Sequence, residues 1–166
     1  MKKQPRGFTL IELLIVIAII LVIAAIAIPN LLRSRTAANQ ASAVSSLRTL
    51  STAEVTYATT YNIGYSANLT DLGPPATGVS PNSTAADIID SVLAGTGGPS
   101  EKSGYLFTYS PGAVASGKVM SFSIHADPVS RGLTGLNSYY VDDSGVIREN
   151  QSGTQATSAD SPLAGG

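Results

Sequence analysis

An uncharged apolar segment near the N-terminus limits what this chain can fold into more than any other feature of the sequence. Leu13 to Leu32 are twenty residues without a formal charge, and most of them are aliphatic. At a rise of about 1.5 Å per residue, a helix of this length matches a bilayer core of roughly 30 Å. The segment is therefore long and apolar enough to span a membrane.

The charges before this segment set its expected orientation. Lys2, Lys3 and Arg6 precede the apolar run. Positively charged flanks stay on the cytoplasmic side of a membrane, so the residues after the span are expected outside the cytoplasm.

Composition bounds the rest of the chain. Of 166 residues, 43% are hydrophobic and 13% are charged, which leaves room for one compact domain after the apolar segment. The chain has no cysteine, so that domain must be held by packing, by neighbours or by an ion. The formal net charge is -1; without the three N-terminal cations, 7 basic side chains face 11 acidic ones, or -4. No direct nucleic-acid site is indicated.

A single carboxylate, Glu12, stands at the head of the apolar run. A cleavable secretory signal would explain the apolar residues, with Ala25-Ile26-Ala27 as a loose cleavage pattern, but it does not explain the charge. In a plain membrane anchor an ionisable group costs about 2 to 3 kcal/mol at the membrane centre and less near its edge. Neither interpretation explains the carboxylate of Glu12, which a partner of opposite charge would stabilise.

A third interpretation supplies that partner. The stretch Gly7-Phe8-Thr9-Leu10-Ile11-Glu12, with the apolar run and Pro29 behind it, resembles the N-terminal segment of type IV pilins and type II secretion pseudopilins. The resemblance implies a leader of residues 1–7, cleavage between Gly7 and Phe8 by a prepilin peptidase, and N-methylation of Phe8. It also implies that Glu12 neutralises the amine of Phe8, in the same chain or in a neighbouring subunit, which would make a buried carboxylate tolerable.

The same resemblance implies the function. It predicts a structural subunit of a type IV pilus, with a pseudopilin of a type II secretion system as the alternative. The implied partners are further copies of the chain in a homopolymer, the prepilin peptidase, an inner-membrane assembly platform with its ATPase, and a secretin. The precursor would lie in the inner membrane and the mature subunit in an extracellular pilus; no cofactor and no enzymatic activity are implied.

One long helix is expected from residue 8 to about residue 61. Residues 8–32 form its hydrophobic half, and residues 33–61 form an amphipathic half. Pro29 lacks a backbone donor, so a kink or local unwinding is expected there, and the resemblance implies a role for it in filament packing. The apolar positions of the second half recur every three or four residues: Val44, Leu47, Leu50, Ala53, Tyr57 and Tyr61.

The remaining residues predict an α+β fold, in which the second half of the helix packs on a small antiparallel sheet; this plan also resembles the pilin globular domain. Residues 62–103 read as a connecting loop with a short helix near 84–94. Residues 104–149 read as the sheet, and residues 150–166 as a flexible tail. The expected strands are 105–109, 119–124, 138–141 and 145–148, with a hairpin turn at 142–145.

Sequence motifs for bond chemistry are scarce. His125 is the only histidine, and no nucleophile and base can be paired with it, which disfavours a hydrolase. Asp142 and Asp143, with Asn150, could supply oxygen ligands to calcium, but their spacing matches no defined calcium loop. A charged hairpin turn explains the two aspartates better.

Overall fold

A computed structural model describes residues 7–163. Leader residues 1–6 and the last three residues of the predicted tail, 164–166, lie outside the described part of the chain. The elements in order are α1 (Leu10–Tyr61), the 3-10 helix η1 (Leu69–Leu72), α2 (Ser91–Ala94), β1 (Glu101–Lys102), β2 (Tyr105–Pro111), β3 (Val114–Ala115), β4 (Lys118–Val119), β5 (Phe122–Pro128), β6 (Ser138–Asp142), β7 (Arg148–Asn150) and β8 (Ser161–Pro162).

The chain divides into two compact units, one ending at Arg35 and one beginning at Thr36. Helix α1 contributes to both, and it is continuous through Pro29. The local unwinding expected at Pro29 is therefore not found in the single chain. Pro29 still lacks an N–H, so the carbonyl of Ala25, four residues earlier, has no helical donor from it.

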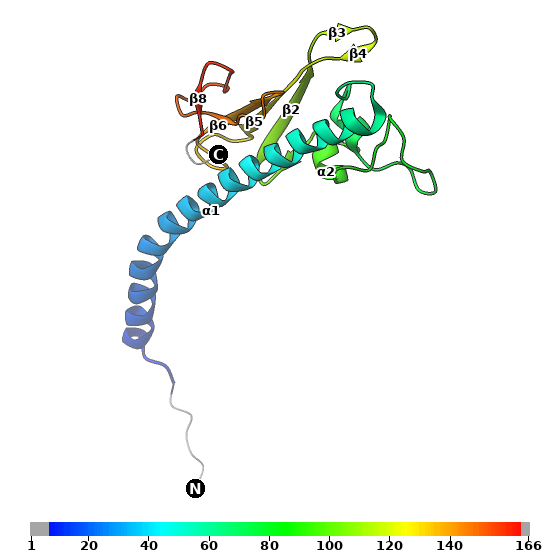
Figure 1. Ribbon diagram of the computed structural model, residues 1–166. Helices are drawn as coiled ribbons and strands as arrows, with labels where there is room; N and C mark the ends of the chain where they lie inside the picture. Colours follow the sequence, from blue (N-terminus) through cyan, green and yellow to red (C-terminus); the bar gives the residue numbers. More distant parts are fainter. Residues whose placement is uncertain (1–6, 164–166) are drawn as a thin grey trace. The chain divides into compact units, whose positions relative to one another are not determined.

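In the second unit, α1 packs against a sheet, which confirms the predicted α+β, pilin-like fold (Figure 1). The helix buries one face at a spacing of three to four residues, as expected for an amphipathic helix. The opposing side chains come from alternate positions of β2, β5 and β6. The shared core includes Ala43, Leu47, Leu50, Ala53 and Tyr57 of α1, and Tyr105, Phe107, Phe122, Ile124, Ala126, Tyr139 and Val141 of the sheet.

The sheet has six strands in the order β1-β2-β5-β6-β7-β8, and every neighbouring pair is antiparallel. In the longest pairing, Phe107 of β2 lies opposite Ala126 of β5. Strands β3 and β4 form a separate two-stranded hairpin. A backbone hydrogen bond of 3.0 Å from Tyr65 N to Val119 O places this hairpin near the C-terminal end of α1.

The predicted helix at 84–94 is wrong for most of its length, because only Ser91–Ala94 are helical. Backbone donors that a helix would use internally bind another segment instead. The amide of Ala86 donates to Asp71 O at 2.8 Å, and the amide of Ile88 donates to Leu72 O at 2.9 Å. Asp87 also has a φ of 57°, which interrupts any right-handed helix. The apolar residues of this segment reach the core in a non-helical conformation.

Two predicted strands are displaced. The expected strand at 119–124 divides into the end of β4 and the start of β5, with Met120 and Ser121 between them. Backbone hydrogen bonds from Gly112 N to Ser121 O and from Met120 N to Ala113 O join the two arms of the hairpin at this point. The expected strand at 145–148 begins at Arg148, since residues 143–147 belong to the turn after β6. In that turn Asp142 Oδ1 accepts a hydrogen bond of 3.0 Å from Ser144 N.

The predicted flexible tail is wrong for its described residues, 150–163. Strand β8 pairs with β7, and Ala156 between them is completely buried. Asp160 accepts hydrogen bonds from the Asn150 side chain at 2.8 Å and from Thr157 N at 2.7 Å, and its carbonyl accepts one from Arg148 at 2.9 Å. Small polar residues thus form an ordered segment here, because strands earlier in the chain provide hydrogen-bond partners.

A buried carboxylate joins α1 to the loop that follows it. Glu54 is fully buried; its Oε2 accepts from Ser66 N at 2.9 Å and its Oε1 from Ser66 Oγ at 2.6 Å. Tyr109 of β2 donates to Ser66 O at 2.7 Å, so the same residue also contacts the sheet. The one ion pair among residues 7–163 joins Lys102 and Asp90, so Glu54 has no cation beside it. Burial raises the pKa of Glu54, and the hydrogen bonds from Ser66 only partly oppose this.

The raised pKa of Glu54 predicts a pH-dependent stability. The folded chain binds this proton more tightly than the unfolded chain, so the free energy of unfolding should fall as pH rises above 4.5, the ordinary value for this group. Glu54→Gln should remove this part of the decrease. Urea unfolding of the detergent-solubilised chain at several pH values measures both slopes, and equal slopes for the two proteins would contradict the assignment.

Candidate functional site

The N-terminus of α1 is built around Thr9 and Glu12. Thr9 directly precedes the first helical residue, Leu10, and Glu12 lies in the first turn. Thr9 N and Thr9 Oγ1 donate to Glu12 Oε2 at 2.8 and 2.7 Å, while Glu12 N donates to Thr9 Oγ1 at 3.3 Å. These reciprocal bonds form a capping box, which satisfies backbone donors that a helix start leaves unpaired. The carboxylate also lies at the positive end of the helix dipole.

The capping box uses only one oxygen of the carboxylate. Both donations from Thr9 go to Oε2, and within residues 7–163 nothing donates to Oε1 of Glu12. The side chain is exposed, so this oxygen is accessible to another donor. Glu12 can therefore cap its own helix and bind a cation with the same carboxylate.

Gly7 and Phe8 precede the helix in non-helical backbone, although the sequence predicted helix from residue 8. Phe8 is 83% exposed. A Cβ added at Gly7 would have no atom within 4 Å, so the Gly7–Phe8 peptide bond lies in open space. A non-helical, accessible bond of this kind is open to a peptidase.

The helix that follows is apolar on every face. All large apolar side chains from Leu10 to Leu32 are at least 48% exposed in the single chain. Among the described residues, α1 is the one helix long and apolar enough to cross a membrane, and its apolar part lies near the N-terminus. Pro29 lies seventeen residues after Glu12, or about 26 Å along the helix axis. It is therefore part of the apolar half of α1 but lies far from the helix start at Glu12.

The other predicted site residues lie in the second unit: His125 in β5, Asp142 at the end of β6 and Asp143 in the turn after it. His125 is paired with Thr108 and Tyr140 on neighbouring strands, and its ring centroid lies 5.1 Å from that of Tyr140. Asp142 bonds the backbone of its own turn, and Asp143 is exposed. No group of three His, Cys, Asp or Glu side chains suited to a metal occurs in the described part of the chain.

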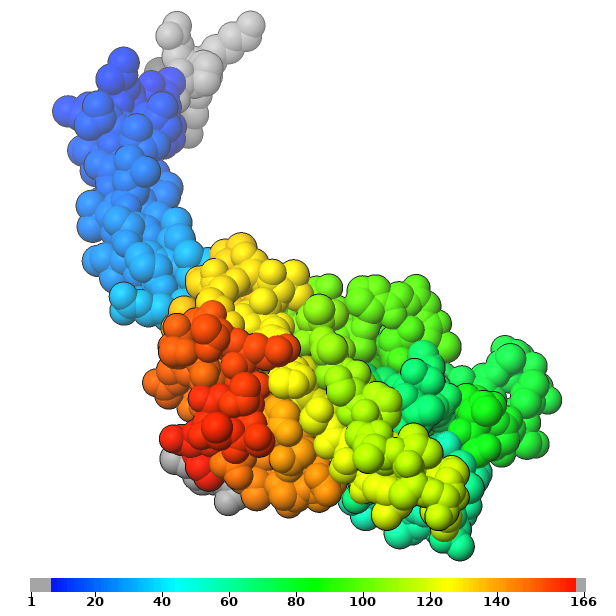
Figure 2. All heavy atoms as spheres, turned by 90° about the horizontal axis from the view of Figure 1, so that it is seen from above, coloured from blue at the N-terminus to red at the C-terminus, as the bar shows by residue number. Residues whose placement is uncertain are grey.

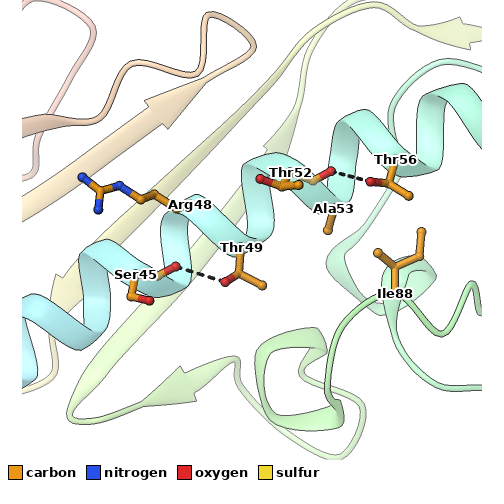
Figure 3. A pocket seen from close by; sticks show the side chains of 7 residues that line it. All are labelled: Ser45, Arg48, Thr49, Thr52, Ala53, Thr56 and Ile88. Atoms are coloured by element: carbon orange, nitrogen blue, oxygen red, sulfur yellow. Dashed lines mark hydrogen bonds between the residues drawn. The ribbon is translucent and has the colours of Figure 1, made fainter. Parts of the chain in front are cut away.

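A shallow hollow lies on the polar face of α1 (Figure 3). Its volume is about 390 Å³. Thr49 donates to Ser45 O at 3.1 Å, and Thr56 donates to Thr52 O at 2.8 Å, so these hydroxyls are used within the helix. The residues around it include no histidine or acid that could activate a hydroxyl: Ser45, Arg48, Thr49, Thr52, Ala53, Thr56 and Ile88.

Comparison with known proteins identifies the N-terminal segment. Residues 2–28 match the family model of the prokaryotic N-terminal methylation motif. The chain is also 50% identical over 54 residues to the type IV major pilin protein PilA of Myxococcus xanthus. It is 65% identical over 37 residues to the type IV wide pilus major component PilA4 of Thermus thermophilus. The N-terminal segment of the chain therefore carries the prokaryotic N-terminal methylation motif and is similar to the matching segment of type IV pilins.

The similarity to these two pilins is partial. It covers 32% and 22% of this chain. The chain spans about a quarter of the length of the curated relatives it matches, 24% of the first and 28% of the second. No solved structure matches the chain significantly. The matched N-terminal methylation motif includes Gly7, Phe8, Thr9 and Glu12, whereas the pilin-like sheet rests on the structure alone.

Thr9 is a site residue that the sequence analysis did not single out. It forms two side-chain hydrogen bonds with Glu12, one as donor and one as acceptor. The sequence does contain the pattern that predicts this contact: Thr9-Leu10-Ile11-Glu12 is the S/T-x-x-E pattern of a capping box directly before an apolar run.

The capping box predicts a specific effect of Thr9→Val. Loss of the hydroxyl should weaken the first turn of α1 by about 1 kcal/mol, while Thr9→Ser should preserve it. Hydrogen exchange of the first-turn amides, measured in lipid nanodiscs, reports this difference. Equal protection in the Val and Ser variants would show that the hydroxyl contributes nothing to the helix start.

Proposed function

We propose that the chain is the structural subunit of a type IV pilus filament. In this proposal a prepilin peptidase cuts between Gly7 and Phe8, the new amine of Phe8 is methylated, and the subunit polymerises through its N-terminal helix. The observation that carries the proposal is the apolar half of α1, whose side chains from Leu10 to Leu32 are exposed and apolar on every face. Such a surface requires lipid before assembly and other copies of itself afterwards.

The geometry around Glu12 supports the proposed assembly contact. Cleavage after Gly7 would create a positively charged amine on Phe8, next to a helix start whose Glu12 has one oxygen that no donor within residues 7–163 reaches. The amine of the same chain or of a neighbouring subunit can bind that oxygen, and burial in an apolar filament core then leaves no unpaired charge. Glu12 would thereby fix the axial register of the subunits.

Pro29 fits the same proposal. Helix α1 is continuous at this position in the single chain, but the carbonyl of Ala25 lacks its usual donor. Local unwinding of the helix therefore costs the least free energy at this position when subunits pack around one another. Pro29 would adjust the length of the helix without breaking the capped N-terminus.

The proposal names partners and locations in addition to the homopolymer. The precursor would span the inner membrane, where the peptidase, the assembly platform and the cytoplasmic ATPase act on it, and the filament would pass a secretin to the cell surface. The chain itself would perform no bond chemistry and need no cofactor. Its charges and exposed sheet would form the outer surface of the filament.

The intact mass of the protein in material sheared from the surface of native cells tests this proposal. A species that begins at methylated Phe8 and is abundant in this fraction is expected. The same species confined to the cell envelope would favour a pseudopilin of a type II secretion system. A chain beginning at Ile28 would indicate a cleaved secretory signal and would overturn the filament proposal.

Replacement of Glu12 tests the assembly contact separately from processing. Glu12→Ala should leave cleavage after Gly7 largely intact but prevent efficient polymerisation, because the Phe8 amine loses its counter-charge. Glu12→Gln is the matched control, since its amide oxygen can still accept from Thr9 without the charge. Filament yield from sheared cells should fall in both variants; normal yield with Gln would show that the cap alone suffices.

A further inference from the structure

The loop between β5 and β6 exposes three large apolar side chains. Val129, Leu133 and Leu136 are 54%, 63% and 56% exposed, and all lie within the nine residues 129–137. This β5–β6 loop is on the surface of the second unit, coloured golden yellow in Figure 2. Apolar side chains grouped in one short loop commonly mark an interaction surface.

Hydrogen bonds hold the β5–β6 loop in this conformation. Thr134 N donates to Ser130 O at 2.8 Å, and Gly132 N donates to Gly135 O at the same distance. Tyr105 OH donates to Asn137 O at 2.9 Å, which ties the end of the loop to the core. The apolar side chains are therefore presented by a folded loop.

Within the second unit, the β5–β6 loop is attached to α1 at Thr36 and Asn39. Asn39 Nδ2 donates to Thr134 O at 2.9 Å, and Thr36 Oγ1 donates to Leu133 O at 3.4 Å. Thr36 is the fourth residue after Leu32, so it lies about 6 Å further along the helix axis. The headgroup region of a bilayer is about 5 to 8 Å deep on each side of the hydrocarbon core. A chain that spans the bilayer with Leu13–Leu32 thus brings Thr36 and the attached loop to headgroup depth.

The charges around this position favour an anionic surface. No acidic residue occurs from Leu13 to Ala53 or from Pro128 to Val141. The charged residues next to the apolar segment are Arg33 and Arg35, both exposed. The guanidinium of Arg131 in the loop donates to Ser138 Oγ at 2.7 Å and to Leu136 O, so it holds the loop in place. Arginines that flank an apolar surface pair with lipid phosphates, whereas the same surface on a second copy of the chain would repel them.

We propose that the β5–β6 loop is a membrane-docking surface that binds anionic phospholipid headgroups while the unassembled subunit spans the bilayer. Val129, Leu133 and Leu136 enter the interfacial region, and Arg33 and Arg35 contact phosphates. The proposal rests on the proposed function only in placing α1 in a membrane before assembly. Docking would hold the second unit against the bilayer, and extraction into a filament would have to release it.

Single-cysteine variants of the full chain test the proposal, because the sequence contains no cysteine. Ser130→Cys places a fluorophore in the loop and keeps all three apolar side chains. Ala115→Cys is the matched control: it is also exposed, but it lies on the β3–β4 hairpin, near the other end of α1. Ile19→Cys reports the membrane span itself. The proteins are reconstituted in phosphatidylcholine vesicles containing phosphatidylglycerol, with nitroxide-labelled lipids as quenchers.

Headgroup nitroxides are expected to quench the label at residue 130 several-fold more than the label at residue 115. Leu133→Ser with Leu136→Ser should abolish most of that difference, and both substitutions are at exposed positions that the fold tolerates. Arg33→Gln with Arg35→Gln should make the quenching of the label at residue 130 independent of phosphatidylglycerol.

Three results would overturn the proposal. Equal quenching at residues 130 and 115, with the label at residue 19 quenched by mid-chain nitroxides, would reject the docking surface and leave the membrane span intact. An unquenched label at residue 19 would reject the membrane span itself, and with it that part of the proposed function. Disulfide cross-links between copies of unlabelled Ser130→Cys, with no quenching by lipid nitroxides, would assign the surface to a second copy.

Discussion

The apolar half of α1, Leu10–Leu32, has no cover within the described part of the chain, and this constrains everything else about the molecule. Its large apolar side chains are all exposed, and the free energy of hydrating so long an apolar surface is unfavourable. The chain therefore needs lipid or other copies of itself as part of its folded environment. The capped start at Thr9 and Glu12 matters for the same reason, because inside lipid or a filament no water could satisfy the first turn of the helix.

The second half of α1 stabilises the small second unit, which has no cysteine to form a disulfide. One helix face covers the sheet, and the buried carboxylate of Glu54 binds the loop that leaves the helix. The segment after β7 then returns to the sheet through β8 and the hydrogen bonds of Asp160. Packing and local hydrogen bonds therefore provide the stability that a disulfide supplies in many exported domains of this size.

The site at the helix start was largely predictable, because its residues are neighbours in sequence. Gly7, Phe8 and Glu12 followed from the motif, and Thr9 could have followed from the capping pattern. The helix at 84–94 could not be excluded from its own residues, since Ala85, Ile88 and Ile89 show helical spacing and Gly95 does end a helix. The backbone donors of this segment bind Asp71 and Leu72, which a local pattern does not reveal.

By itself the sequence determined the features that depend on local spacing: a long helix with an apolar and an amphipathic half, its N-terminal motif, and an antiparallel sheet after it. Only the tertiary structure decided which segments bind one another over long distances in the chain. It ordered the tail against β7, buried Glu54 beside Ser66, and attached the β5–β6 loop to Thr36 and Asn39. The physical reason is that periodicity records which face of an element is apolar, whereas a hydrogen-bond partner is chosen by the fold as a whole.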